Sequence, residues 1–212
     1  MTERLKKILS EITPCRKFAD VGCDHGYAAK AVLDEGIASF AVVSDISAPS
    51  LQKAVKLLAG YGNRVRAVVC NGFEKIDPDC DQALIAGMGG EEIINILEGA
   101  PFLPARLVLQ PMKNADKLRK RLLSIGYRIL KDYLFKDGKY YFLIVAEKGS
   151  DEYTDDELFF GRDNLTGNNP DFTEYAKEQT EKYARYLSSE KLGEESRAEI
   201  LKIIERYERV LK

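Results

Sequence analysis

The chain has 212 residues, 45% of them hydrophobic and 31% charged, with a formal net charge of −2. This length suits one medium domain, or one domain with an appendage, and the near-neutral charge excludes nucleic-acid binding through an overall positive field. The four cysteines form no Cys-x-x-Cys pair and His25 is the only histidine, so a zinc finger is excluded. Free thiols are expected, and no metal site. No apolar run approaches ~18 residues and the N-terminus is amphipathic, so we expect a cytoplasmic protein with no membrane partner and no signal peptide.

Short apolar runs alternate with helical stretches up to residue 126. An amphipathic helix opens the chain and stops before Pro14, because the residue before proline disfavours helix. Strands are then predicted at 17–22, 40–45, 65–70, 82–90 and 105–111. Helices are predicted at 27–36, 48–62, 91–99 and 114–126. Such alternation is typical of a parallel sheet with right-handed crossovers.

The pattern changes after Gly126. Two apolar runs within 127–149 flank Lys136-Asp137-Gly138-Lys139, and Asp-Gly between such runs predicts a β-hairpin. Five parallel strands followed by an antiparallel pair form the outline of the Rossmann-like methyltransferase fold. The predicted fold class is therefore α/β, with a mostly parallel sheet.

The last part of the chain differs again. A polar, turn-rich stretch over 151–172 is predicted to be a connector. From Phe172 onward, apolar residues recur at helical spacing in 172–187 and 200–211, on either side of Gly193. We expect a helical hairpin that covers the domain, dimerises or contacts substrate. The predicted division is a methyltransferase domain at 1–149 and a helical appendage at 150–212.

The loop after the first strand carries carboxylates where a nucleotide-binding loop carries glycine. Aligned with the dinucleotide fingerprint G-x-G-x-x-G, it reads Gly22-Cys23-Asp24-His25-Gly26-Tyr27. A carboxylate in place of the second glycine, ~4 Å from a phosphate, would cost about 4 kcal/mol at an effective dielectric near ~20, so NAD and ATP are poor ligands. S-adenosylmethionine has no phosphate and carries a sulfonium and an ammonium. Asp20 is expected to hold loop amides or that ammonium, and Gly22 and Gly26 to permit the turn and the approach of the ligand.

The other cofactor contacts are expected at the following strand ends, where doubly wound sheets bind ligands. Asp45 is expected to accept both ribose hydroxyls. After the third strand, an amide can read the adenine edge and an aromatic ring can stack on it. The fourth strand ends beside the expected position of the reactive methyl group. The complete predicted cofactor set is Asp20, Gly22, Cys23, Gly26, Asp45, Ile46, Asn71, Gly72, Phe73, Ala86, Gly87, Met88 and Gly89.

These motifs are similar to those of a known family. The chain resembles the bacterial tRNA (adenine(22)-N(1))-methyltransferases through ADVGCDHGY, SDISAPSLQKA, NGFEKI, IAGMGGEEIINIL, LVLQPMKNADKLRKRL and DGKYYFLIVAEKG, over about the first 150 residues. Ala28-Ala29, Asn71-Gly72 and Gly161-Arg162 depart from the family pattern of Leu-Pro, Asp-Gly and Gly-Pro. The resemblance implies methylation of N1 of a tRNA adenine from S-adenosylmethionine, with a coiled-coil appendage at the C-terminus.

The candidate catalytic residues are Asp24, His25 and Tyr27. Adenine N1 has a free lone pair and needs little help from a base, but its product is cationic, so Asp24 is expected to stabilise or orient that charge. His25 and Tyr27 are expected to flank the base. The alternatives are that Asp24 caps the loop, that His25 makes its hydrogen bonds within the loop, and that Tyr27 belongs to the helix core.

RNA binding requires cations, and the charge of this chain is uneven. Residues 112–148 hold ten Lys or Arg against four Asp or Glu, whereas 150–212 hold ten against sixteen. The first stretch is the candidate phosphate track, and an ordinary solvated face is the alternative. Gln110 either forms hydrogen bonds with a base edge or, together with Pro111, has only a structural role as the rigid end of the fifth strand. The candidate RNA-binding residues are Gln110, Lys113, Lys117, Arg119, Arg121, Arg128 and Lys139.

Two other functions remain open from the residues alone. One is a methyltransferase that acts on a small molecule or a protein. The other is a cofactor-binding or scaffold protein without turnover, with the acidic helices as its docking surface. We expect tRNA as the partner and a monomer or weak oligomer.

Overall fold

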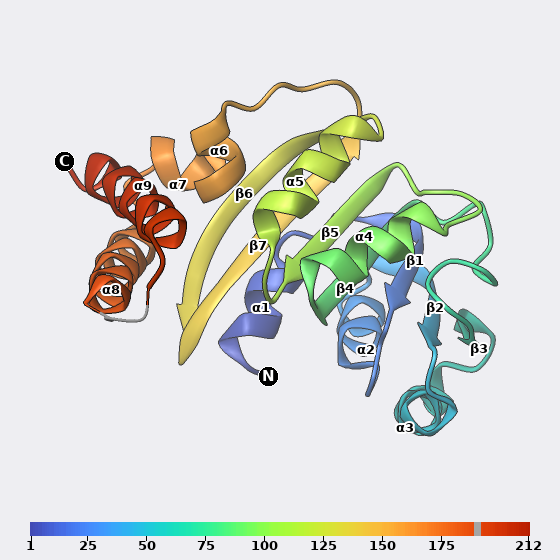
Figure 1. Ribbon diagram of the computed structural model, residues 1–212. Coiled ribbons are helices and arrows are strands. Elements are labelled where there is room, and N and C mark those ends of the chain that lie inside the picture. The colour runs from blue at the N-terminus through green and yellow to red at the C-terminus, as the bar shows by residue number, and fades with distance from the viewer. Residues whose placement is uncertain (189–191) are drawn as a thin grey trace.

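The computed structural model describes residues 1–188 and 192–212 (Figure 1). At its centre lies a sheet of seven strands in the order β3-β2-β1-β4-β5-β7-β6. The strands are β1 (Cys15–Val21), β2 (Ala38–Asp45), β3 (Val65–Val69), β4 (Gln82–Met88), β5 (Arg106–Pro111), β6 (Tyr127–Asp137) and β7 (Lys139–Lys148). Strands β1 to β5 pair in parallel, and β7 pairs antiparallel with both β5 and β6. The predicted α/β methyltransferase sheet with its closing hairpin is confirmed.

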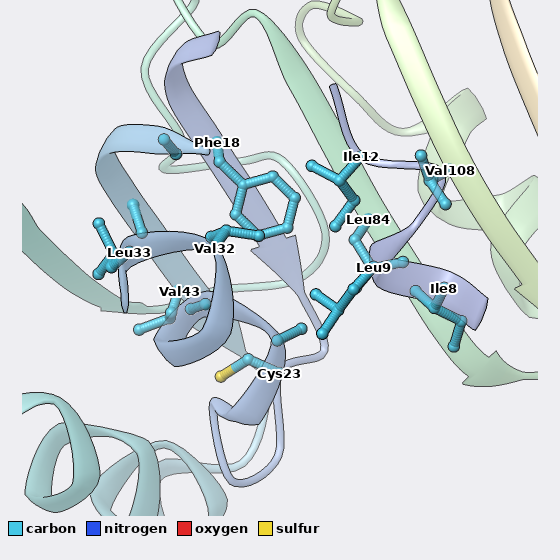
Figure 2. Packing of buried hydrophobic residues seen from close by; sticks show 14 of the residues in the cluster. Ile8, Leu9, Ile12, Phe18, Cys23, Val32, Leu33, Val43, Leu84 and Val108 are labelled. Carbon is cyan, nitrogen blue, oxygen red and sulfur yellow. The ribbon is translucent and has the colours of Figure 1, made fainter. Parts of the chain in front are cut away.

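Helices cover both faces of this sheet. They are α1 (Glu3–Leu9), α2 (Tyr27–Asp34), α3 (Ala48–Leu58), α4 (Gly90–Glu98) and α5 (Ala115–Ser124). Because side chains alternate along a strand, β1 sends Phe18 to the face covered by α1, α2 and α3 (Figure 2) and Ala19 to the face covered by α4 and α5. The predicted helix over 48–62 is α-helical only to Leu58 and continues as the 3₁₀ segment η1 (Ala59–Arg64).

The carboxyl ends of the parallel strands meet at one edge of the sheet. The strand order reverses between β1 and β4. From β1 the chain adds β2 and β3 on one side of the sheet, and then returns to add β4 and β5 on the other side. Asp20 lies level with Val43 of β2 and Leu84 of β4, so the loops that follow these strands emerge side by side. This is the switch point at which α/β sheets bind ligands.

The C-terminal part is more helical than its sequence predicts. The stretch predicted to be a connector contains α6 (Asp155–Phe160) and α7 (Arg162–Thr166), because Thr154 caps α6 in a capping box with Glu157 and supplies the missing start signal. The predicted helical pair is present as α8 (Pro170–Leu187) and α9 (Glu194–Val210), which lie side by side in Figure 1. The predicted break between them falls partly on 189–191, outside the described residues.

An aromatic cluster joins these helices to the sheet. Phe160 of α6 packs edge-to-face against Phe172 of α8 and Tyr207 of α9, with ring centroids 5.7 and 5.2 Å apart. The same cluster includes Leu134 of β6. The helices α6 to α9 therefore share buried apolar surface with the hairpin. Strand β7 ends at Lys148, and the division into two domains at residue 149 stays a prediction.

Candidate active site and cofactor site

The loop between β1 and α2 is held in shape by β2. Backbone N–H groups of Gly22 and Cys23 donate to the Ser44 carbonyl at 2.8 and 3.0 Å, and the Asp24 N–H donates to the Asp45 carboxylate at 3.2 Å. Three of the loop residues, Gly22, Asp24 and Gly26, have positive φ angles of 71°, 45° and 74°. Aspartate tolerates this region better than most residues, so the sequence accommodates a carboxylate at the tip of the turn.

The two glycines of this loop serve different neighbours. A Cβ on Gly22 would lie 1.9 Å from Cε of Met88, so the thioether of Met88 lies directly across the glycine. A Cβ on Gly26 would lie 2.9 Å from the Cβ of Ala54 on α3. Gly26 therefore allows α2 and α3 to approach each other; it lines neither of the cavities described below, and its contact with the cofactor stays a prediction.

Two cavities meet at Gly22 and Met88. The methyl-side cavity measures about 470 Å³ and lies between the loop, the end of β4 and helix α1. The adenosine-side cavity measures about 450 Å³ and lies at the ends of β2 and β3 against α4. Both are bordered by Gly22 and Met88. Together they form one elongated site along the carboxyl edge of the sheet, with Met88 between its halves.

The methyl-side cavity contains the predicted loop carboxylates. Its lining includes Asp20, Cys23, Asp24, Ala86 and Gly87. Asp20 is only 5% exposed and accepts one hydrogen bond, from the Ala29 N–H at 3.3 Å. Burial raises the pKa of Asp20 to about 7, because the charged form loses its water. Burial also raises the pKa of the Cys23 thiol, so this cysteine is no candidate nucleophile.

The candidate catalytic residues lie at the mouth of this cavity. His25 Nδ1 lies 2.7 Å from Asp24 Oδ2, and Lys53 Nζ lies 3.7 Å from the other carboxylate oxygen. The His25 and Tyr27 rings stack with centroids 5.5 Å apart and an interplanar angle of 11°. Tyr27 is 57% exposed, so it is not helix core. The loop therefore presents a carboxylate and a pair of aromatic rings to solvent at the cavity entrance.

The adenosine-side cavity is lined by most of the remaining predicted cofactor residues. These are Asp45, Ile46, Asn71, Gly72 and Met88. The Asp45 carboxylate accepts hydrogen bonds from the Asp24 and Ser47 N–H groups, and Ile46 is 73% exposed beside it. Phe73 is a correction. It is 1% exposed and packs edge-to-face on Phe102 at 5.8 Å, so no face of its ring is available to stack on a ligand.

Gly89 also differs from its prediction. It is the N-cap of α4 and does not line either cavity. A Cβ there would lie 3.1 Å from Cε of Lys113. The close approach of the loops after β4 and β5 depends instead on Gly90, where a Cβ would lie 2.3 Å from the Asn114 carbonyl oxygen.

Two of the predicted RNA-binding residues are buried, which corrects their assignment. Gln110 is 0% exposed and accepts a hydrogen bond from Arg4 Nε at 2.9 Å, so it does not present its amide to a base. Arg119 is also 0% exposed. It donates to Asp132 at 2.7 and 2.9 Å and to the Leu158 and Phe159 carbonyls at the end of α6. Arg119 therefore holds α6 against the sheet and does not contact phosphate.

The other predicted cations lie at least partly in solvent, and several already have carboxylate partners. Lys117 pairs with Glu91, Arg121 with Glu98, and Arg128 with Glu147. Lys113 and Lys139 form no ion pair within residues 1–188 and 192–212. Paired surface cations attract phosphate less strongly, because the neighbouring carboxylate must first give up its interaction.

Arg4 lines the methyl-side cavity and is not among the residues predicted from the sequence. Its guanidinium lies 5.1 Å from the centroid of the Tyr141 ring. A signal was present, because Arg4 precedes Ile8 and Ile12 by four and eight residues and so shares the buried stripe of the first helix. A cation in that stripe indicates a polar neighbour inside the fold.

Across 1–188 and 192–212, no helix combines the length and apolar character needed to cross a bilayer. In the same residues, no three His, Cys, Asp or Glu side chains gather in a way that could hold a metal ion. The four cysteines are free.

Comparisons with known proteins agree with this geometry. A family model described as a methyltransferase domain matches residues 1–145. A curated tRNA (adenine(22)-N(1))-methyltransferase of Bacillus subtilis is 29% identical over 174 residues, which cover 79% of this chain and 73% of the relative. A protein of Mycoplasma pneumoniae, named as a candidate tRNA methyltransferase, is 31% identical over 153 residues, or 69% of this chain and 71% of the relative. A Streptococcus pneumoniae protein crystallised with S-adenosyl-L-methionine superposes with a TM-score of 0.91 at 26% identity, covering 100% of both chains.

Proposed function

We propose the reaction of this protein from one premise, that the chain belongs to the methyltransferase-domain family and, within it, to the bacterial tRNA (adenine(22)-N(1))-methyltransferases. The protein transfers a methyl group from S-adenosylmethionine to N1 of an adenine in tRNA, and position 22 is the expected target. The single observation that carries this proposal is the segment of 20–26, whose two carboxylates, Asp20 and Asp24, line a cavity where a phosphate-binding protein would present glycine and backbone N–H groups.

The residues present fit S-adenosylmethionine. Asp20 and Asp24 border the cavity that would hold its cationic end, and Asp45 and Asn71 border the cavity that would hold adenosine. Asp45 already accepts two backbone N–H groups, but a carboxylate has about four acceptor sites and can still accept ribose hydroxyls. Gly22 lies at the junction of the two cavities. Because it has no Cβ, the Met88 side chain can occupy the space beside it. The bound cofactor supplies an electrophilic methyl carbon on a positively charged sulfur.

The chain itself contributes alignment and charge. The exposed rings of His25 and Tyr27 offer a flat apolar face on which a displaced adenine can stack, an interaction worth about 1–3 kcal/mol per base. N1 uses its own lone pair and becomes cationic as the methyl group arrives. Asp24, at the same entrance, stabilises that developing charge, and its contacts to His25 and Lys53 hold the carboxylate in place.

The candidate phosphate track is retained as a proposal in reduced form. It consists of Lys113, Lys117, Arg121, Arg128 and Lys139, without the buried Arg119. Lys113 supports this role best among the residues of α5 and the loop before it, because it is exposed beside the carboxyl edge of the sheet and has no ion-pair partner within the described residues.

Identification of the product tests the reaction. The protein is incubated with methyl-labelled S-adenosylmethionine and a tRNA transcript that has adenine at position 22, and the digested nucleosides are separated. Label in 1-methyladenosine is expected. A transcript with guanine at position 22 is the matched control and should stay unlabelled. Label in another nucleoside, in protein or in a small molecule would refute the proposal. Absence of label from the transcript with adenine at position 22 would also refute it.

The substitution Asp24→Asn tests the role of the carboxylate. Asparagine tolerates the positive φ angle of this position and keeps the side-chain shape, so the loop should fold normally. We expect kcat to fall about a hundredfold, or ~2.7 kcal/mol of transition-state stabilisation, while cofactor affinity changes little. Asp34→Asn is the matched control, because Asp34 is an exposed carboxylate on α2 outside both cavities. Equal turnover of the Asp24 and Asp34 variants would remove Asp24 from the mechanism.

A further inference from the structure

The β6–β7 hairpin extends past the end of its neighbour β5 and contacts helix α1, whose first turn lines the methyl-side cavity. Strand β7 pairs with β5 only from Ile144 to Glu147, so its first residues continue beyond the carboxyl edge of the sheet. The tip is tied to helix α1, because the Arg4 N–H donates to the Asp137 carboxylate at 2.8 Å. Figure 1 shows α1 between this tip and α2. The hairpin tip therefore holds the first turn of α1, and that turn lines the cavity through Thr2, Arg4 and Leu5.

The guanidinium of Arg4 is held in a defined position on this wall. Its Nε donates to Oε1 of Gln110, which is fully buried and anchored in turn by donation of its own amide to the Pro111 carbonyl at 3.1 Å. The Tyr141 ring supports the guanidinium at 5.1 Å. These contacts use one nitrogen and one face of the group. The two terminal nitrogens of Arg4 form no hydrogen bond or ion pair within residues 1–188 and 192–212.

A second cation shares the same ring. Lys139 Nζ lies 5.7 Å from the Tyr141 centroid, is exposed at the hairpin tip, and has no carboxylate partner in the described part of the chain. The Asp137 carboxylate of the tip accepts the Arg4 backbone N–H but forms no ion pair with either cation within the described residues, so both charges can still attract an anion. This pair therefore differs from Lys117, Arg121 and Arg128, whose charges are already balanced by glutamates.

From this arrangement we infer that Arg4, on the wall of the methyl-side cavity, and Lys139, on the adjoining hairpin tip, form an oxyanion site, and that Gln110 positions Arg4 for it. The inference rests on the proposed function, which supplies two oxyanions. One is a phosphate of the RNA strand beside the target adenine, and the other is the carboxylate of the cofactor's methionine end. The planar fork of arginine suits either group bidentately.

Two binding measurements with the full-length protein distinguish these sources. One is the affinity for tRNA at several salt concentrations, and the other is the affinity for S-adenosylmethionine by calorimetry. If the site binds phosphate, Arg4→Gln and Lys139→Gln each weaken tRNA binding about tenfold and lower the slope of log affinity against log salt by about 0.7–0.9, with cofactor affinity unchanged. If it binds the carboxylate, Arg4→Gln weakens cofactor binding about tenfold instead.

Two further variants exclude a general effect on folding or charge. Gln110→Glu keeps Arg4 in place but gives its guanidinium an internal carboxylate, so the same binding defect as in Arg4→Gln is expected. Lys56→Gln removes one exposed cation of α3 outside both cavities and should change neither affinity. Wild-type affinities for both ligands in the folded Arg4 and Lys139 variants would overturn the inference. Because every readout is a binding constant, this result is separate from a failure to find 1-methyladenosine.

Discussion

The buried carboxylate of Asp20 predicts how cofactor binding depends on pH. The side chain lines the methyl-side cavity at the end of β1, is 5% exposed and accepts a single hydrogen bond from Ala29. Its pKa is raised to about 7 by burial, by more than the Ala29 contact lowers it. At about pH 6 roughly ten molecules are therefore protonated for each ionised one, whereas at about pH 8 the ratio is inverted. A cationic ligand selects the ionised form.

Affinity for S-adenosylmethionine should accordingly be about tenfold weaker at about pH 6 than at about pH 8, a difference of ~1.4 kcal/mol. Calorimetry at these pH values measures the change, and titration in two buffers with different ionisation enthalpies should show proton release near pH 6. Asp20→Asn should bind more weakly and without this pH dependence. Asp34→Asn, the exposed control, should keep it. A constant wild-type affinity, or an unchanged slope in Asp20→Asn, would refute the role assigned to Asp20.

The same pKa has a consequence for the stability of the protein without ligand. The folded pKa of Asp20, about 7, lies above the ordinary value of 3.8, so between these two pH values the folded state binds more protons at this site than the unfolded state. Stability therefore decreases as pH rises through that window, by at most ~1.4 kcal/mol per pH unit from this group. Saturating cofactor should reduce this loss, because it favours the ionised form.

Two substitutions test the geometry of the site and of the C-terminal attachment. Gly22→Ala places a methyl group at a positive φ angle and 1.9 Å from Cε of Met88, and the backbone conformation alone costs about 1–2 kcal/mol. Affinity for the cofactor, measured by calorimetry, should therefore fall at least tenfold. An unaltered affinity would contradict the position of Gly22 at the junction of the two cavities. Arg119→Met leaves the Asp132 carboxylate buried without its partner and should lower the free energy of unfolding, measured by urea denaturation, by about 3–5 kcal/mol. The double variant Arg119→Met with Asp132→Leu should recover much of that loss. Normal stability of the Arg119→Met protein would refute the pairing.

Much of the fold follows from local patterns that the sequence displays directly. Alternation of apolar strands with amphipathic helices predicted the parallel sheet, and Asp137-Gly138 predicted the hairpin. The segment of 20–26 was recognisable because its two aspartates and two glycines lie close together in the chain. The two helices over 155–166 were missed, because polar residues dominate them and their start depends on a capping box.

The site was predictable only where a residue and its environment are local. Asp20, Asp45 and Asn71 end strands, and parallel strands bring such ends to one edge, so their positions beside the two cavities follow from the order of elements. Arg119 could not be assigned in this way. Its helix carries five charged residues among ten, and only the packing of α6, some forty residues later, decides that this one cation is covered.

What the sequence determined by itself is therefore the order of strands and helices, the charge of the first loop and, through both, a site for a cationic nucleotide derivative. The tertiary structure decided which polar side chains reach solvent. It placed Gln110 and Arg119 inside, turned Phe73 into the core, and brought Arg4 to the cavity through contacts more than a hundred residues apart in the chain. Burial depends on every element that packs against a residue, and that information is not contained in the residue's own neighbourhood.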